Sequence, residues 1–263
     1  MNVGYVLIML LAIVSGFAIS RFTQSGLQLS WWERVGIGTS AFVGAMFGAK
    51  LPFLFEGWDA FLSGTTWLGD GKTILTGLVG GYLGVEVGKW TFGITQRTGD
   101  SFVVPVAVAI AIGRLGCFYG GCCYGQPTEL PWGVVFSTVD NQSRHPTQIY
   151  EAIFHVTTAL LFIWLAIHER FRGNRFKLYL ILYACYRLLS EWWRPEAEIY
   201  MGFTWYQLGS MAIIVFFAGL WLVDEFRYQD PSRPAGPDSH PPSGPGVNHP
   251  TGVAPSGPPS FGE

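Results

Sequence analysis

The chain of 263 residues is strongly apolar, with 49% hydrophobic and 16% aromatic residues. Charged residues make up only 13%, about half the usual share. The net charge of −2 says little about partners, but the chain has no basic block of the kind that binds nucleic acid, so we expect no nucleic-acid partner. Three of the four cysteines lie between residues 113 and 125, which is not the framework of a secreted disulfide-rich protein.

A helix needs about 20 mostly apolar residues to cross a bilayer. Seven segments approach this requirement, so the sequence predicts an all-α integral membrane protein. The first segment has no positive residues before it, and we expect it to be a retained helix rather than a signal peptide. The seven predicted spans lie at about residues 3–20, 35–55, 73–94, 102–124, 147–169, 176–193 and 203–224.

The distribution of lysine and arginine predicts the orientation of these spans, because basic residues accumulate in cytoplasmic loops. With the N-terminus outside, nine basic residues fall in inside loops and three in outside loops. We therefore expect an outside N-terminus and a cytoplasmic C-terminus. The three on the outside are Lys72, Arg144 and Arg194.

The last part of the chain differs from the rest in composition. Residues 230–263 hold ten of the 16 prolines and almost no large apolar side chains. Such a segment cannot bury enough apolar surface to fold. We expect a membrane domain over residues 1–228 and a disordered cytoplasmic tail over residues 229–263.

Two arginines lie near the middle of predicted spans, where an unpaired charge costs several kcal/mol. Arg187 can pair with Glu191 one turn later, which would leave Arg194 free near the outer boundary. Arg114 has no acidic residue within reach on its own helix, so its partner must be another helix, a backbone carbonyl or a ligand. Two guanidiniums that face one cavity would bind a phosphate bidentately. The alternative is that each arginine links two helices.

The cysteines of the segment GRLGCFYGGCCYG, residues 113–125, allow several interpretations. Zinc prefers four ligands, and no histidine is near Cys117, Cys122 and Cys123, so we expect no metal. Cys122 and Cys123 are adjacent, and Cys117 lies more than one helical turn before Cys122, so a disulfide is also disfavoured. Arg114 could activate Cys117 as a nucleophile, since it lies three residues before it on the helix. The interpretation we favour is small apolar packing.

The segment RHPTQIYEA, residues 144–152, opens the fifth predicted span. His145 precedes a proline and is expected in an extended turn, with Thr147 as a candidate cap for the following helix. His145 is a candidate for proton transfer at the membrane boundary, and a histidine that stabilises the turn is the alternative.

These clusters, in this order, resemble the prolipoprotein diacylglyceryl transferase family. The resemblance covers about residues 1–225, and its motifs are specific only together. The positions that carry it are Gly113, Arg114, Leu115, Gly116, Phe118, Gly121, Gly125, the run PTELPWGVVF at 127–136, RHPTQIYEA at 144–152, and Arg187 with Glu191 and Arg194.

The resemblance implies an enzyme of the bacterial inner membrane that needs no cofactor or metal. It would move a diacylglyceryl group from phosphatidylglycerol to the lipobox cysteine of a preprolipoprotein and release glycerol phosphate. Arginines at positions 114 and 187 would hold the lipid phosphate. The expected catalytic residues are Arg114, His145, Glu151, Arg187 and Glu191. The expected substrate-binding residues are Gly80, Gly81, Gly116, Cys117, Tyr150 and Arg194.

The chain departs from the family pattern at three positions. Val79 stands where the family usually has the histidine of an HGG motif, Cys117 replaces an asparagine, and Cys122 replaces a glutamate. The leading hypothesis is a divergent transferase that binds an anionic phospholipid, with His145 or Glu151 as the base or Cys117 as a covalent acceptor. The alternative is a non-catalytic member that binds lipid or a protein partner, as a subunit of a larger membrane complex.

Overall fold

The computed structural model describes residues 3–54, 73–194 and 201–228, and these are mostly helical. The predicted tail at 229–263 lies outside the described residues. The long helices are α1 (Val3–Thr23), α2 (Trp31–Lys50), α5 (Ile74–Phe92), α6 (Val103–Tyr119), α7 (Thr147–Ile167), α8 (Arg175–Ser190) and α9 (Trp205–Tyr228). The short elements are the 3₁₀ helices η1 (Leu51–Leu54), η2 (Gly99–Phe102) and η3 (Glu191–Trp193), and an antiparallel pair of strands, β1 (Val134–Val135) and β2 (Ser143–Arg144).

Each predicted span coincides with one long helix, but the helices are not equally apolar. Four segments of the described chain are long and apolar enough to cross a membrane. Helix α8 has 16 residues, which extend about 24 Å at 1.5 Å per residue and fall short of the hydrocarbon core. The protein is thus an all-α chain with four clear membrane-spanning candidates: Val3–Thr23, Gly99–Tyr119, Thr147–Ile167 and Trp205–Phe226.

Helix α1 shows the surface expected next to lipid tails. Its sequence is apolar on every side, and Ala12 is the one buried residue of this helix. A helix that is apolar all round is stable in hydrocarbon but not as a surface helix in water. Six of its large side chains are between 52% and 68% exposed: Leu7, Leu10, Leu11, Ile13, Val14 and Phe17.

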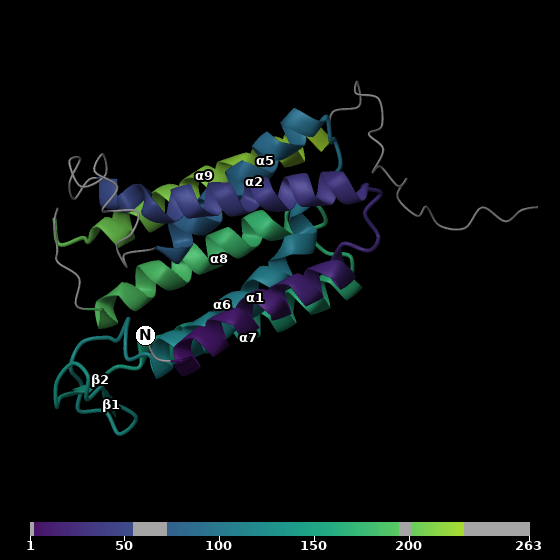
Figure 1. Ribbon diagram of the computed structural model, residues 1–263. Coiled ribbons are helices and arrows are strands. Elements are labelled where there is room, and N and C mark those ends of the chain that lie inside the picture. Colours follow the sequence, from purple (N-terminus) through teal and green to yellow (C-terminus); the bar gives the residue numbers. More distant parts are fainter. Residues whose placement is uncertain (1–2, 55–72, 195–200, 229–263) are drawn as a thin grey trace, which may run out of the picture. The chain divides into compact units, whose positions relative to one another are not determined.

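Helices α2 and α5 pack along each other through facing glycines (Figure 1). A Cβ atom at Gly44 would lie 2.3 Å from the carbonyl oxygen of Gly80. At Gly48 it would lie 2.4 Å from the Thr76 carbonyl, and at Gly84 it would lie 2.2 Å from the Ser40 carbonyl. Without side chains at these positions the two backbones can touch, as in small-residue contacts between membrane helices.

Helix α8 contacts α5, α6, α7 and α9, and its inner face is closed to solvent. Tyr179, Leu180, Tyr183 and Ala184 are at most 1% exposed. A tyrosine can be buried there only if its hydroxyl finds a polar partner. Both hydroxyls find one on α7, where Tyr179 bonds to His155 and Tyr183 donates to Glu151.

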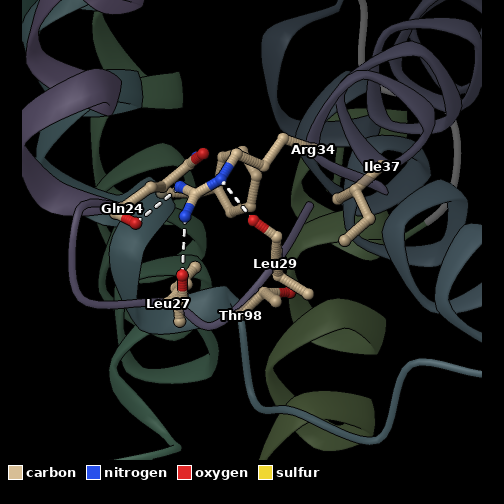
Figure 2. Close-up of a pocket in the computed structure, with 7 residues that line it drawn as sticks. Gln24, Leu27, Leu29, Arg34, Ile37 and Thr98 are labelled. Atoms are coloured by element: carbon tan, nitrogen blue, oxygen red, sulfur yellow. Dashed lines mark hydrogen bonds between the residues drawn. The ribbon is translucent and has the colours of Figure 1, made fainter. Parts of the chain in front are cut away.

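The loop between α1 and α2 is closed by Arg34 at a small pocket (Figure 2). Its guanidinium donates from Nη1 to the Gln24 carbonyl (2.6 Å), from Nη2 to the Leu27 carbonyl (2.6 Å) and from Nε to the Leu29 carbonyl (3.1 Å). One side chain therefore bonds to three carbonyls of this loop, two of which also accept from backbone amides of the loop.

The glycine contact predicts a difference between two alanine substitutions on α2. Gly44→Ala places a methyl group against the Gly80 carbonyl and should lower the free energy of unfolding by about 1–3 kcal/mol. A Cβ at Gly38 meets nothing within 4 Å, so Gly38→Ala is the matched control and should be neutral or stabilising. Thermal unfolding of the detergent-purified variants measures both, and equal midpoints would contradict the packing account.

Candidate functional site

Glu151 lies in the second turn of α7 and is completely buried. Arg114 of α6 donates from Nη2 to its Oε1 atom at 2.8 Å. Arg194, which follows η3, donates from Nη2 to its Oε2 atom at 3.0 Å. The Tyr183 hydroxyl also donates to Oε1. One carboxylate thus joins α6, α7, α8 and the segment after η3.

Arg187 of α8 belongs to the same cluster. Its Nη1 atom is 3.9 Å from Glu151 Oε2, and its Nη2 atom donates to Glu191 Oε2 at 3.1 Å. Glu191 also accepts from the Thr204 hydroxyl at 3.1 Å, and the Arg187 guanidinium lies over the Tyr206 ring, 5.4 Å from its centroid. Two carboxylates therefore orient Arg187, each at a different Nη atom.

The charges of this cluster do not cancel among the described residues. There, three guanidiniums face two carboxylates, which leaves one positive charge in excess. Within the described part of the chain, the buried Nε atoms of Arg114 and Arg194 have no hydrogen-bond partner. Buried donors without partners are rare in proteins, and here they belong to charged groups. The cluster has the charge and the donors that bind an anion.

The structure confirms two of the predicted pairings and corrects a third. Arg187 of α8 pairs with Glu191, four residues later at the start of η3, as the spacing predicted. Arg114 finds its partner on another helix, as the lack of a nearby acidic residue required. Arg194 was expected to be free near the outer boundary, and this was wrong. Arg194 follows η3 directly with extended backbone, and its guanidinium reaches Glu151 from there.

His145 lies in a group of aromatic side chains. Its Nδ1 atom is 3.2 Å from the Tyr150 hydroxyl, and its ring is 6.3 Å from that of Trp193. The same hydroxyl accepts a hydrogen bond from Trp132 at 2.8 Å. Partial burial lowers the pKa of His145 from its ordinary value, so the ring is neutral at pH 7 and can accept a proton.

The expected cap at the start of α7 was also wrong. Helix α7 begins at Thr147, and the preceding residue makes no side-chain cap. The Thr147 hydroxyl instead donates to the carbonyl of Cys123 at 2.7 Å. The next residue, Gln148, donates from Nε2 to the carbonyl of Cys122. The first turn of α7 therefore holds the loop that follows α6.

The expected substrate-binding glycines lie in helix contacts and at a cavity. A Cβ at Gly116 would meet Met9 of α1 at 2.9 Å, so this glycine permits the contact between α1 and α6. Gly80 faces α2 in the glycine contact described above. Gly81 lines an apolar cavity of about 470 Å³ formed mainly by α2, α5 and α6, within the range of ligand pockets. Val79 packs against the apolar core.

Cys117 lies at the end of α6, close to Cys122 and Cys123 of the following loop. The three Sγ atoms lie within 4.8 Å of one another. We expected no metal from the spacing of these residues in the sequence. The structure brings their thiols closer together than that argument assumed, and they are the residues that could hold a metal.

Sequence reasoning missed several polar partners of the cluster. Tyr183 precedes Arg187 by four residues, and His155 follows Glu151 by four, so each lies on the same helix face as a predicted site residue. That spacing of four residues could have identified Tyr183 and His155 from the sequence. No sequence pattern indicates the bond from Thr204 to Glu191, because Glu191 begins η3 and Thr204 directly precedes α9.

The buried carboxylate predicts a large loss of stability in Glu151→Gln. The amide keeps the shape of the side chain but removes the charge that faces three guanidiniums, so the free energy of unfolding should fall by about 3–5 kcal/mol. Glu129→Gln is the control, since Glu129 is exposed and should change stability by less than about 0.5 kcal/mol. Unfolding of both variants in detergent measures this, and equal stabilities would show that the carboxylate is not the organising charge.

The chain is similar in sequence to a family of known proteins. The family model for prolipoprotein diacylglyceryl transferase matches residues 3–223. The phosphatidylglycerol–prolipoprotein diacylglyceryl transferase of Clostridium tetani is 36% identical over 172 residues, 62% of this chain and 68% of that protein. The enzyme of the same name from Legionella pneumophila (strain Corby) is 36% identical over 152 residues, 54% of this chain and 59% of that protein.

A third relative with this name, from Solidesulfovibrio magneticus, aligns over most of both sequences. It is 30% identical over 242 residues, which are 83% of this chain and 88% of that protein. The alignment includes all of the arginine cluster's helices, as does the matched family model. The chain belongs to the prolipoprotein diacylglyceryl transferase family.

Proposed function

We propose that the chain transfers a diacylglyceryl group from phosphatidylglycerol, or another anionic phospholipid, to the cysteine thiol of a prolipoprotein. The relatives above carry this activity in their names. The observation that carries the proposal is the excess positive charge that the described residues leave in the buried arginine cluster, together with the Nε donors of Arg114 and Arg194, which find no partner among those residues. A phosphodiester supplies the missing negative charge and the missing acceptors.

The proposed placement is in the bacterial inner membrane, with all seven long helices spanning, the N-terminus outside and the C-terminus in the cytoplasm. Arg114, Glu151 and Arg187 then lie toward the outer ends of α6, α7 and α8. This places the arginine cluster at the depth where the phosphate of an outer-leaflet lipid meets the hydrocarbon. In this placement α8 and the following η3 together span the membrane, because α8 alone is too short.

A lipid bound at the arginines can extend its acyl chains along α6. Ile110 lies one turn before Arg114 and lines the apolar cavity, together with Val106 and Ala109 of the same helix. The cavity also includes Gly81 of α5. We propose that this cavity receives part of an acyl chain, which leaves the head group at the guanidiniums.

The chemistry that this arrangement supports is displacement at carbon. The acceptor sulfur attacks the glycerol carbon that bears the phosphate ester, so a carbon–sulfur bond forms and the carbon–oxygen bond breaks. Glycerol phosphate leaves with the electron pair, and the thiol proton passes to a base. Arg114 and Arg187 stabilise the charge that develops on the leaving phosphate, while Glu191 keeps Arg187 in position.

His145 is the base that the contacts favour. The carboxylate of Glu151 accepts three hydrogen bonds and faces a further guanidinium, which occupies its oxygens. His145 is neutral at pH 7 and lies beside the hydroxyl of Tyr150. Glu151 then serves to position the arginines, and His145 with Tyr150 handles the proton.

Release of glycerol phosphate tests this proposal. The purified chain is supplied with phosphatidylglycerol and a lipobox peptide, and Arg114→Gln is expected to lower kcat by about 10²–10³-fold. Arg172→Gln is the control, because Arg172 is exposed in the loop before α8 and should not change the rate. Retention of phosphatidylglycerol against phosphatidylcholine is measured on the same variants.

A second candidate, a lipid-binding member without turnover, is favoured by Val79. This side chain packs against the apolar core where the resemblance leads one to expect a histidine. The glycerol phosphate assay distinguishes this candidate from the transferase. Lipid retention that depends on Arg114, with no glycerol phosphate released by the unsubstituted chain, would reject the transferase and support the second candidate.

The role of His145 predicts a particular pH dependence. A base works only when unprotonated, and a pKa below the usual 6.5 keeps His145 neutral until the pH falls below that value. The rate of transfer should therefore hold down to about pH 6.5 and then decline. His145→Gln should lower the rate by about 10²-fold or more and abolish this acid limb. His168→Gln, at the far end of α7, is the matched control; an unchanged limb in His145→Gln would exclude the role.

A further inference from the structure

The cluster of thiols after α6 is a feature that the transfer reaction does not use. Cys117, Cys122 and Cys123 are all free, and their Sγ atoms lie within 4.8 Å of one another. Cys117 is in the last turn of α6, and the other two follow after the helix has ended. Three thiols converge here although they come from both a helix and a loop.

The backbone is bent to bring these thiols together. The amide of Cys122 donates to the carbonyl of Cys117 at 3.1 Å, which folds the loop back over the end of the helix. Cys123 has a φ of 62°, a left-handed conformation that is uncommon for a residue other than glycine. Such strain persists only where the surroundings enforce it, and it often marks a functional position.

Helix α7 supplies the contacts that enforce this bend. The Thr147 hydroxyl and the Gln148 side-chain amide hold the carbonyls of Cys123 and Cys122, respectively. Both α7 side chains are at most 1% exposed. The convergence of the thiols therefore depends on buried side chains with fixed partners.

The chemistry of the cluster selects the kind of ligand. Metal–thiolate bonds of about 2.3 Å hold the sulfurs of one site about 4 Å apart. Small rotations of the three cysteine side chains would bring their sulfurs to this separation. Thiolates favour soft ions such as Cu⁺ and Zn²⁺, whereas Ca²⁺ and Mg²⁺ require oxygen ligands. Arg114, one turn before Cys117, supplies positive charge beside the thiolates.

We propose that Cys117, Cys122 and Cys123 bind one thiophilic metal ion, Zn²⁺ or Cu⁺, through three thiolates. Three ligands suit Cu⁺ directly. Zn²⁺ takes a fourth ligand from solvent, which can enter because Cys123 is exposed. The three thiol protons leave when the ion binds. The three cysteines take no part in the proposed transfer reaction, and Arg114 is the residue that lies beside both sites.

The test measures metal bound to the full chain. Protein purified in detergent with a phosphine reductant is titrated with Zn²⁺, with Cu⁺, and with Cd²⁺ as a spectroscopic probe. Elemental analysis counts the ions per chain, and thiolate-to-metal charge-transfer absorption reports the ligands. One ion per chain is expected, and competition between Zn²⁺ and Cu⁺ identifies which one the site prefers.

Serine substitutions identify the ligands. Cys117→Ser, Cys122→Ser and Cys123→Ser should each weaken binding by at least about tenfold. Cys185→Ser is the matched control, because this partly buried cysteine lies in α8 outside the cluster and should leave binding unchanged. Metal should raise the thermal midpoint of the unsubstituted chain and of Cys185→Ser, but not of the triple variant.

Three results would overturn the proposal. The first is a chain whose three cluster thiols are titratable and which binds no ion. The second is a loss of binding in Cys185→Ser as large as in the cluster variants. The third is a disulfide between Cys117 and either neighbour that forms in place of metal uptake. None of these results bears on lipid transfer, which the glycerol phosphate assay decides separately.

Discussion

The buried carboxylate of Glu151 is the contact on which the arrangement of α6, α7 and α8 depends. Three guanidiniums in an apolar interior would repel one another and pay a large desolvation penalty without it. With it they are fixed in place, yet their charge is only partly balanced. An anion that enters such a site meets donors that are already oriented, so little reorganisation accompanies binding.

The first two turns of α7 connect this charge cluster with the thiol cluster. Glu151 faces the arginines, and Thr147 and Gln148, one turn earlier, hold the backbone of Cys123 and Cys122. A change in the position of α7 would therefore move both clusters at once. The loop that carries His145 leads directly into the same turns, so the chemistry of the protein is concentrated where one helix begins.

The positions of the helices and part of the arginine cluster could be predicted from the sequence, because they depend on residues that are close together in the chain. The apolar segments located all seven long helices, and a spacing of four residues predicted the pair of Arg187 and Glu191. The need of Arg114 for a distant partner was also predictable, but the identity of that partner was not, since it depends on how two helices pack. The position of Arg194 depends on where η3 ends, and the thiol cluster depends on the left-handed conformation of Cys123. Neither follows from a periodic pattern.

The shortness of α8 has a consequence for the polar side chains that it carries. This helix has 16 residues, and Arg187 lies in its last turn. An unpaired charge in an apolar interior is unfavourable by several kcal/mol, and so short a segment has few apolar residues to offset that cost. The partners come from α7, where Glu151 faces Arg187 and accepts from Tyr183, and His155 bonds to Tyr179. The burial of α8 is therefore set by residues of another helix.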